Sequence, residues 1–188
     1  MHNHLVARQR LLRERTPFAD IMLMVIWLMA TPDSFRSVAL RFGTRPSTLY
    51  FHYAYVVEAL RELAPQYISW PDAAERTQIR TTFEDATGFP GIIGCIDCTH
   101  VYITAPMIDT AQYKNRHHSY SFNVQAVVDN DLLVRDLHVG EVGSMHDRRV
   151  FRRSPLCRSL LMDEDAIDAE EHILGDGAYP TTNFVSLP

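Results

Sequence analysis

The chain has 188 residues, of which 46% are hydrophobic and 22% are charged, so it can bury a sizeable core, and this argues against wholesale disorder. Its 18 Lys and Arg residues against 23 Asp and Glu residues give a net charge of −5, which excludes a globally basic nucleic-acid-binding protein. Any contact with nucleic acid must therefore come from local cationic patches or from bound metal ions.

The cysteine count and the hydropathy of the chain indicate the cellular compartment in which the protein is expected. Cys95, Cys98 and Cys157 are too few and too odd in number for a disulfide framework, which favours a reducing compartment. The longest apolar run, residues 21–30, is ten residues long, whereas a membrane span needs about 20. We therefore expect a buried helix in this run and no membrane association.

The residue pattern changes near residues 89–91. Before this point apolar residues recur at helical spacing, and after it the runs are short and rich in Val, Ile and Tyr. The pattern predicts a helical N-terminal region over residues 1–88 and an α/β domain over residues 89–188.

Residues 33–64 have the pattern of a helix, a tight turn and a second helix. Asp33 is expected to cap the first helix, Gly43 to end it in a left-handed conformation, and Pro46 to open the second helix. One apolar stripe on the second helix has a spacing of three and four and consists of Leu49, Tyr53, Val56, Val57, Leu60 and Leu63.

The other face of this second helix carries candidate DNA-binding residues. Its first positions are Arg45, Ser47, Thr48 and His52, which fits a helix-turn-helix that contacts base edges or phosphates. An ordinary helical hairpin fits the pattern equally well.

In the second half, the pattern predicts three strands, a helix and a further strand. The strands are expected at residues 94–104, 120–128 and 132–139, with a hairpin between the last two. The helix is expected to start at His146 or Asp147, and the last strand covers residues 172–174. The acidic residues within 163–171 are interpreted as a solvated loop or helix face.

Two aspartates fall in or beside segments otherwise suited to buried strands. Asp97 lies in the middle of one such segment, and Asp176 follows the last strand between Gly175 and Gly177. A buried carboxylate is costly to desolvate unless it is paired, hydrogen-bonded or bound to a cation. Together the two residues favour a divalent-metal site for phosphoryl transfer, although either one alone is also explained as a loop cap.

Other candidates are weaker. Asp147 is a third candidate ligand, but an aspartate at a helix start is also the expected cap. The loop residues Lys114, Asn115 and Arg116 are suited to a phosphate backbone, and an ordinary exposed loop is nearly as good an explanation. Cys95 and Cys98 face opposite sides of a strand and have no second pair, so we do not expect a zinc site.

Five segments resemble the Harbinger transposase and transposase-derived nuclease family. They occur in the family's order and cover nearly all of residues 90–188, at positions 94–100, 113–116, 120–127, 143–151 and 174–180. The helix-turn-helix pattern at residues 33–64 also matches what the family places before its nuclease domain.

The resemblance implies a ribonuclease-H-like fold and a metal-dependent DNA endonuclease that uses two-metal-ion chemistry with Mg²⁺ or Mn²⁺. Asp97 and Asp176 match the first two catalytic acids of the family, and Asp147 matches a further recurrent acid, so all three are expected metal ligands. The family's glutamate lies downstream of the segment matching 174–180. Residues 177–188 contain no Glu, so we expect a nuclease domain that is truncated before the third acid.

The resemblance also implies DNA as the substrate, a separate DNA-binding partner protein, a homo-oligomer as one option, and a nuclear location. The alternative is a catalytically inactive, truncated or domesticated transposase that acts as a DNA-binding or interaction protein. A hydrolase of small phosphoesters is a more distant alternative, because it would need a closed pocket.

Overall fold

The computed structural model describes residues 16–163, 165–182 and 184–186, which divide between two compact units, Met1–Tyr67 and Ile68–Pro188. The sequence pattern placed the boundary near residues 88–89 instead. The difference arises because the helix after Tyr67 contacts the first strand of the sheet and therefore belongs to the second unit. In the described part of the chain, no helix combines the length and the apolar character that crossing a membrane requires.

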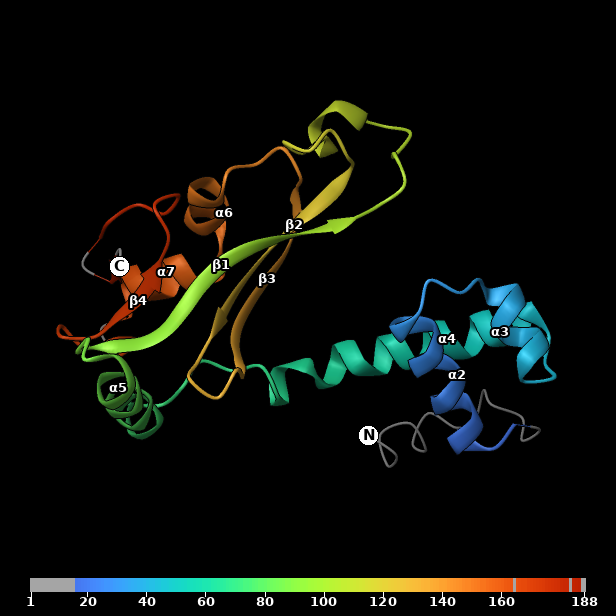
Figure 1. Ribbon diagram of the computed structural model, residues 1–188, viewed down its shortest axis with the longest axis horizontal. Coiled ribbons are helices and arrows are strands. Elements are labelled where there is room, and N and C mark those ends of the chain that lie inside the picture. Colours follow the sequence, from blue (N-terminus) through green and yellow to red (C-terminus); the bar gives the residue numbers. More distant parts are fainter. Residues whose placement is uncertain (1–15, 164, 183, 187–188) are drawn as a thin grey trace. The chain divides into compact units, whose positions relative to one another are not determined.

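In the first unit, the described residues from 16 onward form the helices α2 (Phe18–Ala30), α3 (Phe35–Arg41) and α4 (Pro46–Leu63), followed by the short η1 (Ala64–Gln66) (Figure 1). The predicted helix, turn and helix are present: Gly43 has a φ of 64° between α3 and α4, and Pro46 is in the first turn of α4. The shared core consists of Ile21, Met24, Val25, Val38, Ala39, Leu49 and Val56.

The predicted cap of α3 was wrong. Ser34 is the N-cap, and its Oγ accepts a hydrogen bond from the Ser37 N–H at 3.2 Å. Asp33 instead accepts a hydrogen bond from Nε1 of Trp27 at 2.7 Å, because the half-buried indole N–H needs an acceptor.

The second unit is a mixed α/β structure built on a five-stranded sheet in the order β3-β2-β1-β4-β5 (Figure 1). The sheet consists of β1 (Ile92–Tyr102), β2 (Ser121–Val128), β3 (Val134–Val142), β4 (His172–Gly175) and β5 (Val185–Ser186). Its helices are α5 (Ala73–Thr87), η2 (Thr110–Tyr113), α6 (Asp147–Arg153) and α7 (Pro155–Met162). The order of three strands, helix and strand is confirmed, whereas α7 and β5 were not predicted.

Strand directions set the geometry of this sheet. β1 pairs with β2 and β2 with β3 in antiparallel fashion, while β1 with β4 and β4 with β5 are parallel. Helices α6 and α7 pack against the sheet through one core, formed by Ile93, Ile96, Val127, Phe151, Leu156, Cys157, Leu160, Ala166, Ile173, Tyr179 and Val185. The end of β4, at Gly175, therefore lies beside Ile96 in the middle of β1, on the sheet that this core supports.

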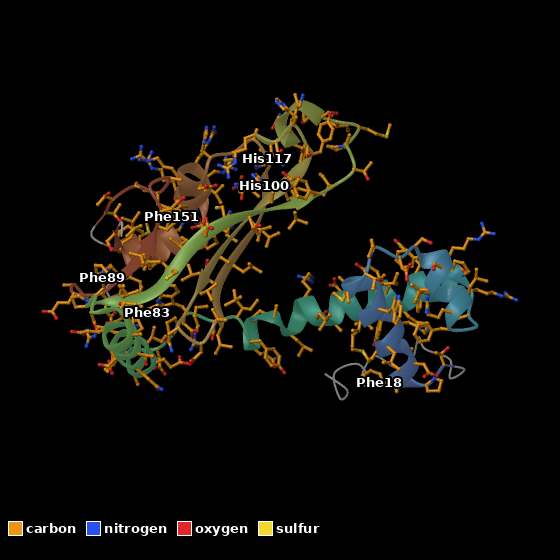
Figure 2. The ribbon with its side chains drawn as sticks, viewed as in Figure 1. Phe18, Phe83, Phe89, His100, His117 and Phe151 are labelled. Atoms are coloured by element: carbon orange, nitrogen blue, oxygen red, sulfur yellow. The ribbon has the colours of Figure 1, made fainter. Side chains whose placement is uncertain are left out.

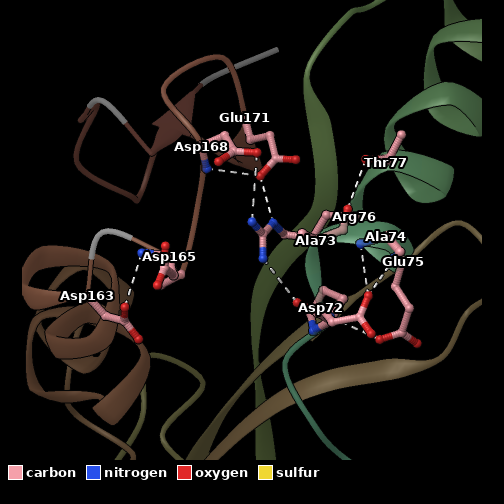
Figure 3. Close-up of polar contacts among 12 residues, drawn as sticks. Asp72, Ala73, Ala74, Glu75, Arg76, Thr77, Asp163, Asp165, Asp168 and Glu171 are labelled. Carbon is pink, nitrogen blue, oxygen red and sulfur yellow. Dashed lines mark hydrogen bonds and ion pairs between the residues drawn. The ribbon is translucent and has the colours of Figure 1, made fainter.

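A buried ion pair ties α5 to the segment before β4. Figure 3 shows the Arg76 side chain extending from α5 to Glu171, whose Oε2 accepts from Arg76 Nε at 2.8 Å. Arg76 is 4% exposed and Glu171 is 1% exposed. The expectation that the acidic residues within 163–171 are solvated was therefore wrong for Glu171, because a partner on α5 compensates its charge.

Candidate functional site

The register of β1 and β4 brings Asp97 and Asp176 to neighbouring positions. Ile96 on β1 pairs with Gly175 on β4, and these two strands run parallel. Asp97 follows Ile96 directly, and Asp176 follows Gly175 directly, so the two aspartates are at the same level of adjacent chains. The sequence separates them by 79 positions, and the parallel pairing removes that separation.

Both aspartates are exposed, so the expectation of buried carboxylates was wrong. Ile96 and its β2 partner Val127 point into the core, and because side chains alternate along a strand, Asp97 points to the opposite face. Asp176 lies just past the end of β4 in a turn, where its Oδ1 accepts from the Ala178 N–H at 2.9 Å.

Each of the two carboxylates keeps one oxygen available. Asp97 Oδ1 accepts from the Cys98 N–H at 2.7 Å, and Asp97 Oδ2 and Asp176 Oδ2 have no hydrogen-bond partner among the described residues. Two exposed carboxylates with available oxygens are a donor set suited to Mg²⁺ or Mn²⁺, which prefer oxygen ligands.

Asp147 is the first residue of α6, not its cap, since His146 occupies the N-cap position. Asp147 Oδ1 accepts a hydrogen bond from Nδ2 of Asn123 at 3.2 Å, and the same Nδ2 donates to the Met145 carbonyl at 3.0 Å. Asn123 is 1% exposed. A buried amide on β2 thus orients this carboxylate.

Asp147 lines a hollow of about 290 Å³. The wall of this hollow consists of Cys98, His100, Lys114, Asn115, Arg116, Gly143, Ser144, Met145, His146 and Asp147. Lys114 and Arg116 are exposed there. The hollow therefore joins two predicted phosphate-contacting cations and one predicted metal ligand, which come from separate segments of the chain.

Asn115 plays a different part from its two neighbours. It is 4% exposed, its Nδ2 donates to Ser121 Oγ at 3.0 Å, and its Oδ1 accepts from the N–H groups of His117 and Ser119. Its side-chain amide shapes the loop that presents Lys114 and Arg116. Figure 2 labels His100 and His117 at the end of the sheet where this loop lies.

Sequence reasoning missed the polar interior beside the hollow. On β2, Ser121, Asn123 and Gln125 are at most 1% exposed, while the apolar residues between them are only half-buried. Through the register, Asn123 pairs with His100 and Gln125 pairs with Cys98. The alternation of polar and apolar residues over 121–127 was the signal, but the usual rule assigns the polar residues to solvent.

The thiol of Cys98 and the hydroxyl of Tyr179 form a contact of 3.2 Å at the base of this region. Burial, together with the carboxylates of Asp147 and Asp97, raises the pKa of Cys98 to about 12 against the opposing effect of the Tyr179 hydrogen bond. Burial also raises the pKa of Tyr179. Both groups are therefore protonated at neutral pH, and Cys98 is not an activated nucleophile.

Within residues 16–163, 165–182 and 184–186, no group of three or more His, Cys, Asp or Glu side chains is gathered in a way that could hold a metal ion. The strand register pairs the residues just before Asp97 and Asp176, and Asp147 lies at the start of α6, but the structure does not gather these three aspartates into one ligand group.

The predicted DNA-binding residues of the first unit differ in their exposure to solvent. Arg45 and Ser47 are exposed at the start of α4, and Thr48 is half-buried. His52 is 7% exposed, so its predicted place on the polar face was wrong. It lies three residues after Leu49 and four before Val56, which puts it on the buried side of α4, and burial lowers its pKa.

Residues 96–188 match the sequence profile of the family described as DDE superfamily endonuclease, and this part of the chain belongs to that family. The match covers Asp97, Asp147 and Asp176 and most of the sheet.

The relatives confirm the resemblance to Harbinger-derived proteins. The chain is 27% identical over 171 residues to Antagonist of like heterochromatin protein 1 of Arabidopsis thaliana, covering 85% of this chain and 43% of the relative. It is 32% identical over 136 residues to HARBI1 of Mus musculus, which carries a provisional nuclease name, covering 72% of this chain and 38% of the relative. The chain thus spans less than half the length of these relatives, and no solved structure matches it.

Proposed function

We propose that the second unit is the nuclease domain of a transposase-derived DNA endonuclease that cleaves phosphodiester bonds with the help of Mg²⁺ or Mn²⁺. The observation that carries this proposal is the register of β1 and β4, in which Ile96 pairs with Gly175, so that Asp97 and Asp176 each follow a paired residue inside the region matched to the endonuclease family. The strand order β3-β2-β1-β4-β5, with β1 and β4 parallel, supports a ribonuclease-H-like fold.

The residues present suit a divalent cation. Asp97 and Asp176 would hold it through their available carboxylate oxygens, and Asp147, oriented by Asn123, is a further ligand candidate. When bound, such a cation activates the attacking oxygen and offsets the charge on the leaving oxygen.

The chain's own residues position the substrate. Lys114 and Arg116 lie in the wall of the 290 Å³ hollow, where their positive charges would bind phosphate oxygens beside Asp147. Asn115 fixes the loop between them, so the two cations are presented by an ordered backbone. This arrangement compensates locally for a net charge of −5.

The first unit would supply a second contact with DNA. Arg45, Ser47 and Thr48 open α4 after a short turn, which is where a helix-turn-helix meets the duplex. A nuclear location and a partner protein follow from the same proposal.

A second candidate is a DNA-binding protein without turnover. The absence of a three-residue ligand group among the described residues favours it. It predicts that DNA binds but is not cleaved.

Manganese-dependent nicking of supercoiled plasmid tests the proposal. The wild-type chain should convert supercoiled plasmid to the open circle, and Asp97→Asn and Asp176→Asn should each slow this by roughly 100-fold, about 2.7 kcal/mol of transition-state stabilisation. Asp131→Asn, which alters an exposed aspartate in the turn between β2 and β3, is the matched control and should nick at the wild-type rate. Binding without nicking by the wild type would favour the second candidate.

A further inference from the structure

The outer surface of α6 and the start of α7 carry a concentration of positive charge that the site described above does not use. Five of the chain's 18 basic residues lie within positions 148–158, and no acidic residue lies among them. These residues are Arg148, Arg149, Arg152, Arg153 and Arg158, and all five are exposed.

The arginines of this surface are mostly unpaired. Arg153 Nε contacts Glu141 Oε1 at 2.9 Å, whereas the other four have no ion pair with any described residue. Arg76 and Arg135, elsewhere in the same unit, each contact two carboxylates. One or two cations near the C-terminus of a helix offset its dipole, but four arginines on a seven-residue helix exceed that need and repel one another.

Helical spacing aligns these charges. Arg148 with Arg152, and Arg149 with Arg153, are four positions apart and share the outer side of α6, while Val150 and Phe151 are buried on the inner side. α6 is seven residues long, or about 10 Å, which corresponds to roughly three nucleotides of one DNA strand.

The junction of α6 and α7 is hollowed. A cavity of about 480 Å³ is lined by Arg152, Arg153, Ser154, Cys157, Arg158, Leu161 and Met162. Three guanidinium groups at one cavity suit phosphate oxygens, which arginine binds in bidentate fashion. Leu161 is 66% exposed and Met162 is 80% exposed, so apolar surface for a sugar or a base lies beside them.

We propose that this surface, the arginine face of α6 together with the cavity at its junction with α7, binds the phosphate backbone of duplex DNA next to the cleavage site. The inference rests on the proposed function. Because α6 begins at Asp147, a strand bound in the hollow beside Asp147 continues along the arginines of the same helix.

The test is the salt dependence of binding to a fluorescein-labelled DNA duplex of random sequence, measured by fluorescence anisotropy with the full chain. The slope of log K against log salt is negative, and Arg152→Gln and Arg158→Gln should each reduce its magnitude by about 0.9, and the double variant by about 1.8. Arg80→Gln, which removes one charge from α5, is the control and should leave the slope unchanged. Circular dichroism of each variant checks that it is folded.

An unchanged slope in the double variant would overturn the inference. The inference would also be overturned if a labelled polyglutamate peptide bound more tightly than DNA at equal salt and the double variant no longer bound that peptide. The surface would then be a binding site for an acidic protein. The plasmid nicking assay separates this inference from the proposed function. A wild-type chain that never nicks, but whose DNA binding depends on Arg152 and Arg158, supports the surface and contradicts the nuclease.

Discussion

Removing the charge of Glu171 should strongly destabilise the second unit. In Glu171→Gln, the guanidinium of Arg76 stays 4% exposed but loses the carboxylate that contacts it at 2.8 Å. The amide that replaces this carboxylate and the Pro71 carbonyl at 3.3 Å are neutral acceptors, and the carboxylate that remains is Asp168 at 3.8 Å, whose side chain is 65% exposed and therefore screened. Leaving one buried charge unpaired costs about 3–5 kcal/mol in the free energy of unfolding.

The effect can be measured on the second unit alone. The chain has two tryptophans, Trp27 in the first unit and Trp70 in the second, and Trp70 Nε1 donates to the Ala166 carbonyl at 2.7 Å. Urea unfolding of Trp27→Phe chains, followed by Trp70 fluorescence, therefore reports the second unit. The double variant Arg76→Met with Glu171→Met should recover most of the lost stability, because no charge is then left buried.

Three results would show whether this reasoning holds. A cost below about 1 kcal/mol for Glu171→Gln would mean that the pair behaves as a solvent-exposed one, and the account of the buried link would be wrong. A double variant as unstable as Glu171→Gln would refute the charge argument as well. The matched control is Arg153→Gln on α6 in the same unit, whose side chain contacts Glu141 at 2.9 Å but is 55% exposed, so no measurable change is expected.

Further predictions concern single side chains. Because burial lowers the pKa of His52 below 6.5, the unfolded chain binds this proton more tightly, so the first unit should lose stability as the pH falls below about 6.5. Urea unfolding followed by Trp27 fluorescence in Trp70→Phe chains should show this loss, and His52→Leu should remove it; an equal loss in both would contradict the assignment. With a pKa of about 12, Cys98 should react with iodoacetamide about tenfold faster for each pH unit up to pH 10, and a plateau by mass spectrometry near pH 9 would refute this. Arg45→Ala should reduce the magnitude of the slope of log K against log salt for DNA binding by about one or less. If the titrations of the wild type and of this variant superimpose, α4 is only part of a structural hairpin.

Local signals in the sequence predicted the elements that depend on neighbouring residues. Gly43 and Pro46 marked the turn before α4 because left-handed backbone and a fixed φ are requirements of single positions. β1 and β2 were predicted to within two residues at each end because their apolar content is high and turn residues bound them.

The remaining features depend on partners far along the chain. Glu171 looked solvated because its partner, Arg76, is 95 positions away. β5 has two residues and exists through its pairing with β4, so no periodic signal could indicate it.

The candidate site likewise combines residues that the sequence predicted with features that it could not predict. Asp97 and Asp176 were identified as candidate ligands because carboxylates in apolar segments need an explanation. Their exposure could not be predicted, since it depends on which sheet face α6 and α7 cover. Asn123, which orients Asp147, was missed because a polar residue in a strand is ordinarily assigned to solvent.

The most direct test of the central claim is manganese binding, measured without any reaction. The full chain is titrated with Mn²⁺, and the electron paramagnetic resonance signal of the free ion gives the bound fraction. The affinity for Mn²⁺ should fall by at least about tenfold in Asp97→Asn and in Asp176→Asn. Asp131→Asn should bind as the wild type does. If Asp97→Asn and Asp176→Asn bind Mn²⁺ as tightly as the wild-type chain, these two aspartates do not share a metal site.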